Sequence, residues 1–293
     1  ATAHSIFNIA CTLILLPMSG LLEKLAYKLV PDTKLPENIS QLDNRLLATP
    51  ALALECAHNL TFEMAKVATD ALRNSIQCLS NYDKEKAQAI RAAEDETDHY
   101  EDVIGSYLVK VSTKRLNDAD GATASMLLRV IGDFERISDH AVNILESAEE
   151  MREKGIAFSD SAKSELDSLS EATLEIISLS YRAFVDENAE QATLVEPLEQ
   201  VIDRLKELLR ARHIDRLRIG DCSIEAGFVW SDLITNMERV SDHCSNIAGC
   251  VMDTKDQNMN LHSSLKMLRI DNDSYRQKYD EYTKKYFSFM QNL

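Results

Sequence analysis

Pairs of carboxylates at helical spacing are the residues of this chain that could carry chemistry. Glu135 and Asp139 are four positions apart, and Glu238 and Asp242 repeat that spacing 103 residues later. On a helix, this spacing places both carboxylates of a pair on one face, where like charges repel. Carboxylate oxygens are also the donors that hard divalent cations prefer. We therefore interpret the pairs as candidate cation sites.

The pairs belong to a longer repeat. Residues 135–140 read Glu-Arg-Ile-Ser-Asp-His, and residues 238–243 read Glu-Arg-Val-Ser-Asp-His. Two further Glu-x-x-x-Asp pairs lie upstream of these stretches, 105 residues apart: Glu94 with Asp98, and Glu199 with Asp203. A repeat at a nearly constant offset predicts a tandem duplication of one structural unit.

The surroundings of the acidic pairs leave two interpretations open. The apolar periodicity places the carboxylates at the border of the buried helix face, where a cation must compensate their burial. That cation could be Arg136 and its counterpart Arg239, or it could be a metal ion. A single pair usually marks a solvated helix face, whereas four copies favour a shared role. His140 and His243 follow the aspartates directly and are rotated away from them, so we interpret both as packing or hydrogen-bonding residues.

The elements that must position these residues are helices. Apolar residues recur at helical spacing through most of the chain, and 8 Gly and 5 Pro are few. The pattern predicts an all-α fold with two three-helix units, residues 51–154 and residues 155–254. The six expected helices cover about residues 52–78, 84–111, 122–151, 159–185, 188–213 and 223–252. Pro197 predicts a kink or a late start in the fifth helix.

The two ends of the chain differ from the repeated part. We expect a membrane-type helix at residues 1–30, because residues 6–22 carry no formal charge. Lysines follow this run, and they favour a cytoplasmic location for the part of the chain downstream of it. A buried amphipathic helix or tail is the alternative. Residues 31–50 predict a linker, and residues 255–293 a tail with a terminal helix. The chain begins at Ala1, so we expect a fragment of a longer protein.

The composition of the chain argues against several classes of function. The net charge of −16 argues against nucleic acid and anionic lipid as partners. The six cysteines include no Cys-x-x-Cys pair, which predicts reduced, buried thiols. The sequence has no Gly-rich phosphate loop and no nucleophile constellation, so we expect no enzyme activity.

One enzymatic alternative deserves a structural test. Glu55-x-x-His58 and Glu96-x-x-His99 have the spacing found in di-iron carboxylate bundles, and a ferritin-like protein would bring these four side chains onto a pair of metals. The second half of the chain has no matching pattern. We therefore interpret the spacing as coincidence.

The repeated stretches resemble a known family. ERISDHAVNI and ERVSDHCSNI are similar to the signature of the PhoU domain, which pairs two three-helix units. ATAHSIFN followed by TLILLP resembles the last transmembrane segment of bacterial sodium/phosphate cotransporters. Residues 42–50 and 279–286 are similar to the connection and the tail of those proteins.

The resemblance implies a cytoplasmic PhoU-like regulatory domain of a sodium-dependent phosphate transporter in the inner membrane. Its partners would be the transporter portion upstream in the same polypeptide, metal ions, sodium and phosphate as transport substrates, and a second copy in a homodimer. A soluble PhoU-type phosphate-signalling adaptor is the alternative. The resemblance also implies iron, zinc or another divalent cation at eight ligands: Glu94, Asp98, Glu135, Asp139, Glu199, Asp203, Glu238 and Asp242.

Overall fold

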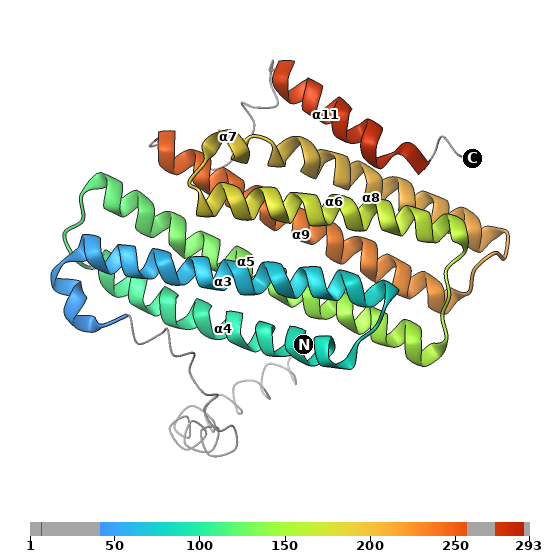
Figure 1. Cartoon of the computed structure of the whole chain (residues 1–293), viewed down its shortest axis with the longest axis horizontal. Helices are drawn as coiled ribbons and strands as arrows, with labels where there is room; N and C mark the ends of the chain where they lie inside the picture. Colours follow the sequence, from blue (N-terminus) through green and yellow to red (C-terminus); the bar gives the residue numbers. More distant parts are fainter. Residues whose placement is uncertain (1–6, 8–41, 257–272, 290–293) are drawn as a thin grey trace. The chain divides into compact units, whose positions relative to one another are not determined.

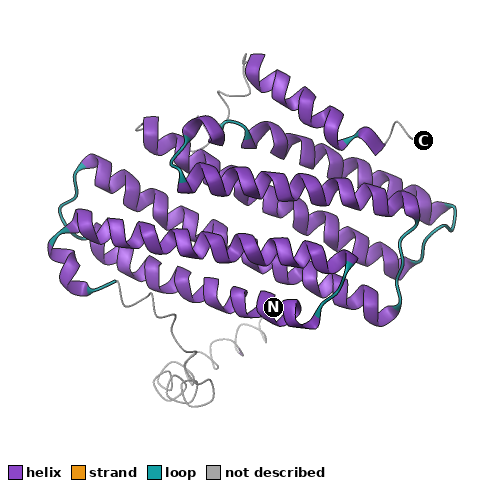
Figure 2. Cartoon of the chain, viewed as in Figure 1, coloured by secondary structure: helices purple, strands orange, loops and turns teal. Residues whose placement is uncertain are grey.

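The computed structural model describes residue 7, residues 42–256 and residues 273–289, and these form helices and turns without strands (Figure 1, Figure 2). Residues 1–39 and 40–293 are two separate compact units, and only the second is described in detail. Apart from Phe7, the expected membrane-type helix at residues 1–30 lies outside the described residues and stays a prediction. None of the described helices combines the length and the apolar character of a membrane span.

The first helix group contains α3 (Pro50–Ser80), α4 (Lys84–Ser112) and α5 (Asp118–Lys154). Each start has a local cause. Pro50 is the first residue of α3, where its missing N–H costs nothing, and the side chains of Asp83 and Asn117 accept backbone N–H groups at the starts of α4 and α5. Helix α5 ends at Lys154, and Gly155 caps it in the left-handed conformation at φ 63° that favours glycine.

The second helix group contains α6 (Asp160–Val185), the short α7 (Ala189–Ala192), α8 (Val195–Arg218) and α9 (Ile224–Asp256). Helix α8 begins two residues before Pro197, within the turn where a proline is tolerated. The sequence predicted one helix over residues 188–213 with a kink or late start at Pro197. The late start is confirmed, and the residues before it form α7 as a separate turn of helix.

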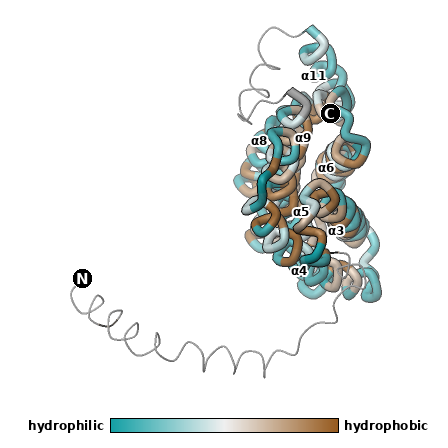
Figure 3. Tube along the Cα trace, turned by 90° about the vertical axis from the view of Figure 1, so that its left-hand side faces the viewer, coloured by the Kyte–Doolittle hydropathy of each residue, from teal (hydrophilic) through white to brown (hydrophobic). Residues whose placement is uncertain are grey.

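Within each group the long helices pack on one another, and the groups meet where α5 lies against α9 and α3 against α6. The described helices carry hydrophilic and hydrophobic stretches side by side, as amphipathic helices do (Figure 3). Helix α11 (Asp273–Tyr286) packs on α8 and α6, where Tyr282 and Tyr286 are buried. A 2.6 Å ion pair joins Lys285 of α11 to Glu175 of α6.

Two sequence predictions need correction. Residues 44–48, predicted as part of a linker, form the 3-10 helix η3 (Asn44–Ala48), whose start is capped by the Asp43 carboxylate. The cysteines in the described residues are free, as expected, but Cys56 and Cys222 are partly exposed rather than buried.

Candidate functional site

The first helix group brings two of the acidic pairs together across α4 and α5. We call Glu94, Asp98, Glu135 and Asp139 the acidic seam. Burial raises the pKa of Glu94, and the negative charges of Asp95, Asp139 and Asp98 raise it further. Burial also raises the pKa of Glu135 to about 7, followed by the charge of Asp139, while Arg136 opposes the shift. The carboxylates of both helices therefore lie close enough to repel one another.

Arg136 is the cation that contacts the acidic seam in the part of the chain that the structure describes. Its Nε lies 3.2 Å from Glu135, and its Nη1 lies 2.8 Å from Asp139. The Arg136 side chain is 60% exposed, so solvent weakens both attractions. Glu101 adds a further negative charge that acts on Glu135. One exposed guanidinium therefore contacts two of these carboxylates, Glu135 and Asp139.

The second helix group places a lysine at the corresponding place. Lys206 follows Glu101 by the same 105 residues that separate the other equivalent positions of α4 and α8. Its Nζ lies 2.8 Å from Glu238, and both side chains are largely buried. Arg239 lies 3.4 Å from Asp242. The second set of carboxylates therefore has a buried cation of its own, whereas none is found at the acidic seam among the residues that the structure describes.

The remaining two predicted ligands lie on α8. The Glu199 carboxylate accepts a hydrogen bond from Gln200 at 2.7 Å, and Asp203 is exposed. Among the described residues, no three His, Cys, Asp or Glu side chains are arranged to hold a metal ion. The donor chemistry of the acidic seam nevertheless fits a hard cation, since it consists of oxygen ligands with excess negative charge. The second set fits less well because Lys206 already neutralises Glu238.

The histidines of the repeated motif lie between the two helix groups. His140 Nδ1 is 2.8 Å from Asn236 Oδ1, and His243 Nδ1 is 2.8 Å from Asp133 Oδ1. The two imidazole rings lie 5.6 Å apart between centroids. The prediction that these histidines serve packing and hydrogen bonding is confirmed. The repeated sequence thus builds the contact of α5 with α9 as well as the carboxylate pairs.

The di-iron arrangement is absent from the described residues. His58 packs against Phe62 at 4.4 Å and Phe184 at 5.7 Å between ring centroids, and its Nδ1 lies 3.6 Å from Glu187. Glu55 and Glu96 do not join His58 and His99 in a metal-binding group. The convergence of these four side chains that a ferritin-like protein requires is therefore not found in the described part of the chain.

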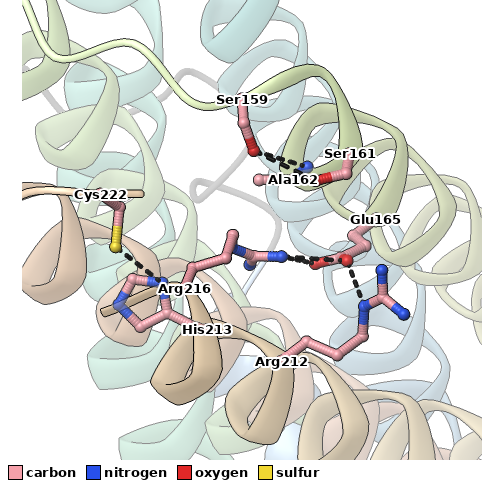
Figure 4. A network of polar contacts seen from close by, with 8 residues as sticks. All are labelled: Ser159, Ser161, Ala162, Glu165, Arg212, His213, Arg216 and Cys222. Carbon is pink, nitrogen blue, oxygen red and sulfur yellow. Dashed lines mark hydrogen bonds and ion pairs between the residues drawn. The ribbon is translucent and has the colours of Figure 1, made fainter. Parts of the chain in front are cut away.

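Sequence reasoning missed a buried ionic cluster near the end of the second helix group (Figure 4). Glu165 of α6 is fully buried and accepts hydrogen bonds from Arg212 Nε at 2.5 Å and from Arg216 Nη1 at 2.8 and 3.0 Å. The four-residue spacing of the two arginines on α8 was the available signal, because it places both on one helix face.

The helix groups correspond to a known sequence family. A sequence model described as the PhoU domain matches residues 61–148 and residues 166–251. The phosphate-specific transport system accessory protein PhoU homolog 1 of Thermotoga maritima is 31% identical over 121 residues. That match covers 41% of this chain and 51% of the relative, so the chain spans about half the length of the curated relative that it matches.

Solved structures show the same fold. The crystal structure of PhoU from Pseudomonas aeruginosa superposes with a TM-score of 0.66 at 19% identity, covering 70% of this chain and 98% of that one. The phosphate transport system regulatory protein PhoU from Streptococcus pneumoniae superposes with a TM-score of 0.64 at 17% identity, covering 72% of this chain and 99% of that one. At these identities the likeness establishes the arrangement of helices.

Proposed function

Because this chain belongs to the PhoU domain family, we propose that it is a non-enzymatic PhoU-type regulatory adaptor that modulates phosphate uptake by binding a phosphate transport system. The observation that carries this proposal is the match of the family's sequence model to both helix groups. The Thermotoga maritima relative, an accessory protein of phosphate-specific transport, and the Streptococcus pneumoniae structure, a regulatory protein of phosphate transport, support it.

A second candidate function rests on the N-terminal sequence. The uncharged run 6–22 and the lysines after it favour a regulatory domain fused behind the membrane part of a sodium-dependent phosphate cotransporter, on the cytoplasmic face of the inner membrane. Alkaline carbonate extraction of membranes from cells that express the chain distinguishes the two. The fused domain stays with the membranes, whereas the free adaptor is extracted.

The regulatory proposal is tested in the source organism. Deletion of the coding region for residues 42–293 should raise the uptake of radiolabelled phosphate at high external phosphate, and re-expression should restore the lower rate. Unchanged uptake and an unchanged response to phosphate starvation would refute the proposal. Light scattering of the purified chain decides whether the adaptor is a homodimer.

We also propose that the acidic seam binds a divalent cation such as iron, zinc, manganese or magnesium. Glu94, Asp98, Glu135 and Asp139 would hold it, and the cation would neutralise their mutual repulsion. The raised pKa of Glu135 and the absence of a buried lysine among these contacts support this assignment. Elemental analysis of the full chain, purified without chelator, should find metal that is lost when Glu135 and Asp139 become Ala. Equal metal content in both proteins would overturn the assignment.

A further inference from the structure

A cavity of about 430 Å³ lies where the connection from α5 to α6 meets the connection from α8 to α9. None of the acidic-seam residues lines it. Two long helices begin beside it. Ser159 Oγ accepts the Ala162 N–H at the start of α6, and Ser223 Oγ accepts the Ala226 N–H at the start of α9. The first turns of both helices carry partial positive charge, which favours an anion.

Two residues of the cavity wall carry buried nitrogen donors without a partner. They are Arg216 Nη2 and Trp230 Nε1. The exposed fractions of these residues are 7% and 1%. Buried donors without an acceptor are rare in folded proteins, and a bound ion or water is one explanation for them. Arg216 and Trp230 both line the cavity, so an acceptor bound there would have two such donors in its wall.

The ionic cluster beside the cavity has an excess positive charge. Its one carboxylate, Glu165, faces two guanidinium groups. Arg216 Nη1 contacts both oxygens of Glu165, which leaves its Nη2 edge free, and the guanidinium also lies 5.0 Å from the centre of the Trp230 ring. Figure 4 shows Arg216 between Glu165 and His213. Solvent reaches Arg212, so its charge is partly screened, and an anion in the cavity would give the buried Arg216 a second partner at its free edge.

Other charged groups line the cavity but do not reverse this balance. Asp221 and Glu225 are exposed, so solvent screens their repulsion of an anion. Lys154 is also exposed and holds Glu150 at 2.6 Å. The buried part of the cavity wall therefore contains nitrogen donors and one cation, Arg216, with a free edge. The carboxylates that line the cavity, Asp221 and Glu225, are exposed to solvent.

We propose that this cavity binds a phosphate-class oxyanion through Arg216, Trp230 and the first turns of α6 and α9. Pockets for small organic ligands begin at roughly 300 Å³, so the volume also accommodates a phosphate group carried by a small molecule. The proposal goes beyond the regulatory function because it gives the domain a ligand site of its own, separate from the acidic seam.

The experiment uses Trp230, which is the only tryptophan of the chain, as a reporter in the cavity wall. The purified full chain is titrated at constant ionic strength with inorganic phosphate, sulfate and adenosine monophosphate, with fluorescence and calorimetry as readouts. We expect saturable binding of at least one of these oxyanions. Preference for inorganic phosphate or for the monoester identifies whether the free ion or a phosphorylated molecule is the ligand.

Two variants and one control test the assignment of residues. Arg216→Lys keeps a positive charge beside Glu165 but lacks the second nitrogen edge, and should weaken binding about tenfold or more. The exposed Arg115, which does not line the cavity, provides the matched control Arg115→Lys, and this variant should bind like the parent. Trp230→Phe keeps an aromatic ring without the N–H donor and should weaken binding measured by calorimetry.

Absence of saturable binding up to about 10 mM of each oxyanion would overturn the proposal and assign both donors to water. Unchanged affinity in both Arg216→Lys and Trp230→Phe, with native circular dichroism, would also overturn it. The measurement needs no transporter, so its failure is distinguishable from failure of the proposed regulatory function.

Discussion

Replacement of Glu165 by glutamine tests whether the buried ionic cluster stabilises the second helix group. The change preserves shape and removes one negative charge. In the native protein this fully buried carboxylate accepts three hydrogen bonds, one from Arg212 and two from Arg216. Glu165→Gln would leave two guanidinium groups facing a neutral amide that cannot accept all of these bonds.

The expected loss in the free energy of unfolding depends on how deeply the ion pair is buried and on whether each arginine can reach solvent after the substitution. Removing one partner of a buried ion pair costs about 3–5 kcal/mol. The Arg212 side chain is 27% exposed and can turn toward water, whereas the Arg216 side chain is buried and cannot. We therefore expect a loss at the lower end, about 3 kcal/mol. For a chain of this size that corresponds to a decrease in Tm of about 6–12 °C.

Urea denaturation of both proteins, followed by far-ultraviolet circular dichroism, measures the difference in the free energy of unfolding. Asp167→Asn is the matched control, because Asp167 is an exposed acid on the same helix and should contribute within about 0.5 kcal/mol. A loss below about 1 kcal/mol for Glu165→Gln, or an equal loss in the control, would refute the reasoning.

Three further predictions test other parts of the molecule. Burial lowers the pKa of His58 below 6.5, so the unfolded chain binds this proton more tightly and stability falls as the pH drops below about 6.5; His58→Gln should reduce that fall in urea denaturation series. Asp133→Ala leaves His243 without its acceptor and should lower the free energy of unfolding by about 1–3 kcal/mol in the same assay. Glu101→Lys copies Lys206 into the first helix group and should lower the metal content found by elemental analysis.

Each of these predictions has a contrary outcome. Parallel pH profiles for His58→Gln and the parent would contradict the role of His58 burial. Asp232→Ala is an exposed control on α9, and an equal effect in it would contradict the interface argument for Asp133. Asp102→Lys adds the same charge at an exposed neighbour of Glu101, so loss of metal in both variants would indicate a general charge effect.

The helices could be predicted because their causes are local. Apolar spacing lies within each helix, the capping residue Asp83 directly precedes α4, and Pro197 lies in the first turn of α8, where its missing N–H is tolerated. The separation of α7 from α8 was missed, since Ala189–Ala192 has the same helix-forming composition as its surroundings.

The candidate site could be predicted only in part, because some of its contacts depend on how the helices pack on one another. Spacing alone places Glu135 and Asp139 on one face, but the partner of Glu238 depends on how α8 packs on α9. Comparison of the repeats could have flagged Lys206 as the counterpart of Glu101. The unpartnered donors of the cavity follow from packing at the end of the helix group, and such long-range packing leaves no pattern in a single sequence.

The contacts between His140 and Asn236 and between His243 and Asp133 have the form of an isologous interface, in which equivalent residues exchange partners about a two-fold axis. A homodimer of one helix group would keep both halves identical. A covalently joined pair can differ on its two sides. Here Asp133 carries a charge where its counterpart Asn236 carries an amide, and Lys206 stands where its counterpart is Glu101. Joining the two helix groups in one chain thus permits their charged residues to differ while both groups keep the same arrangement of helices.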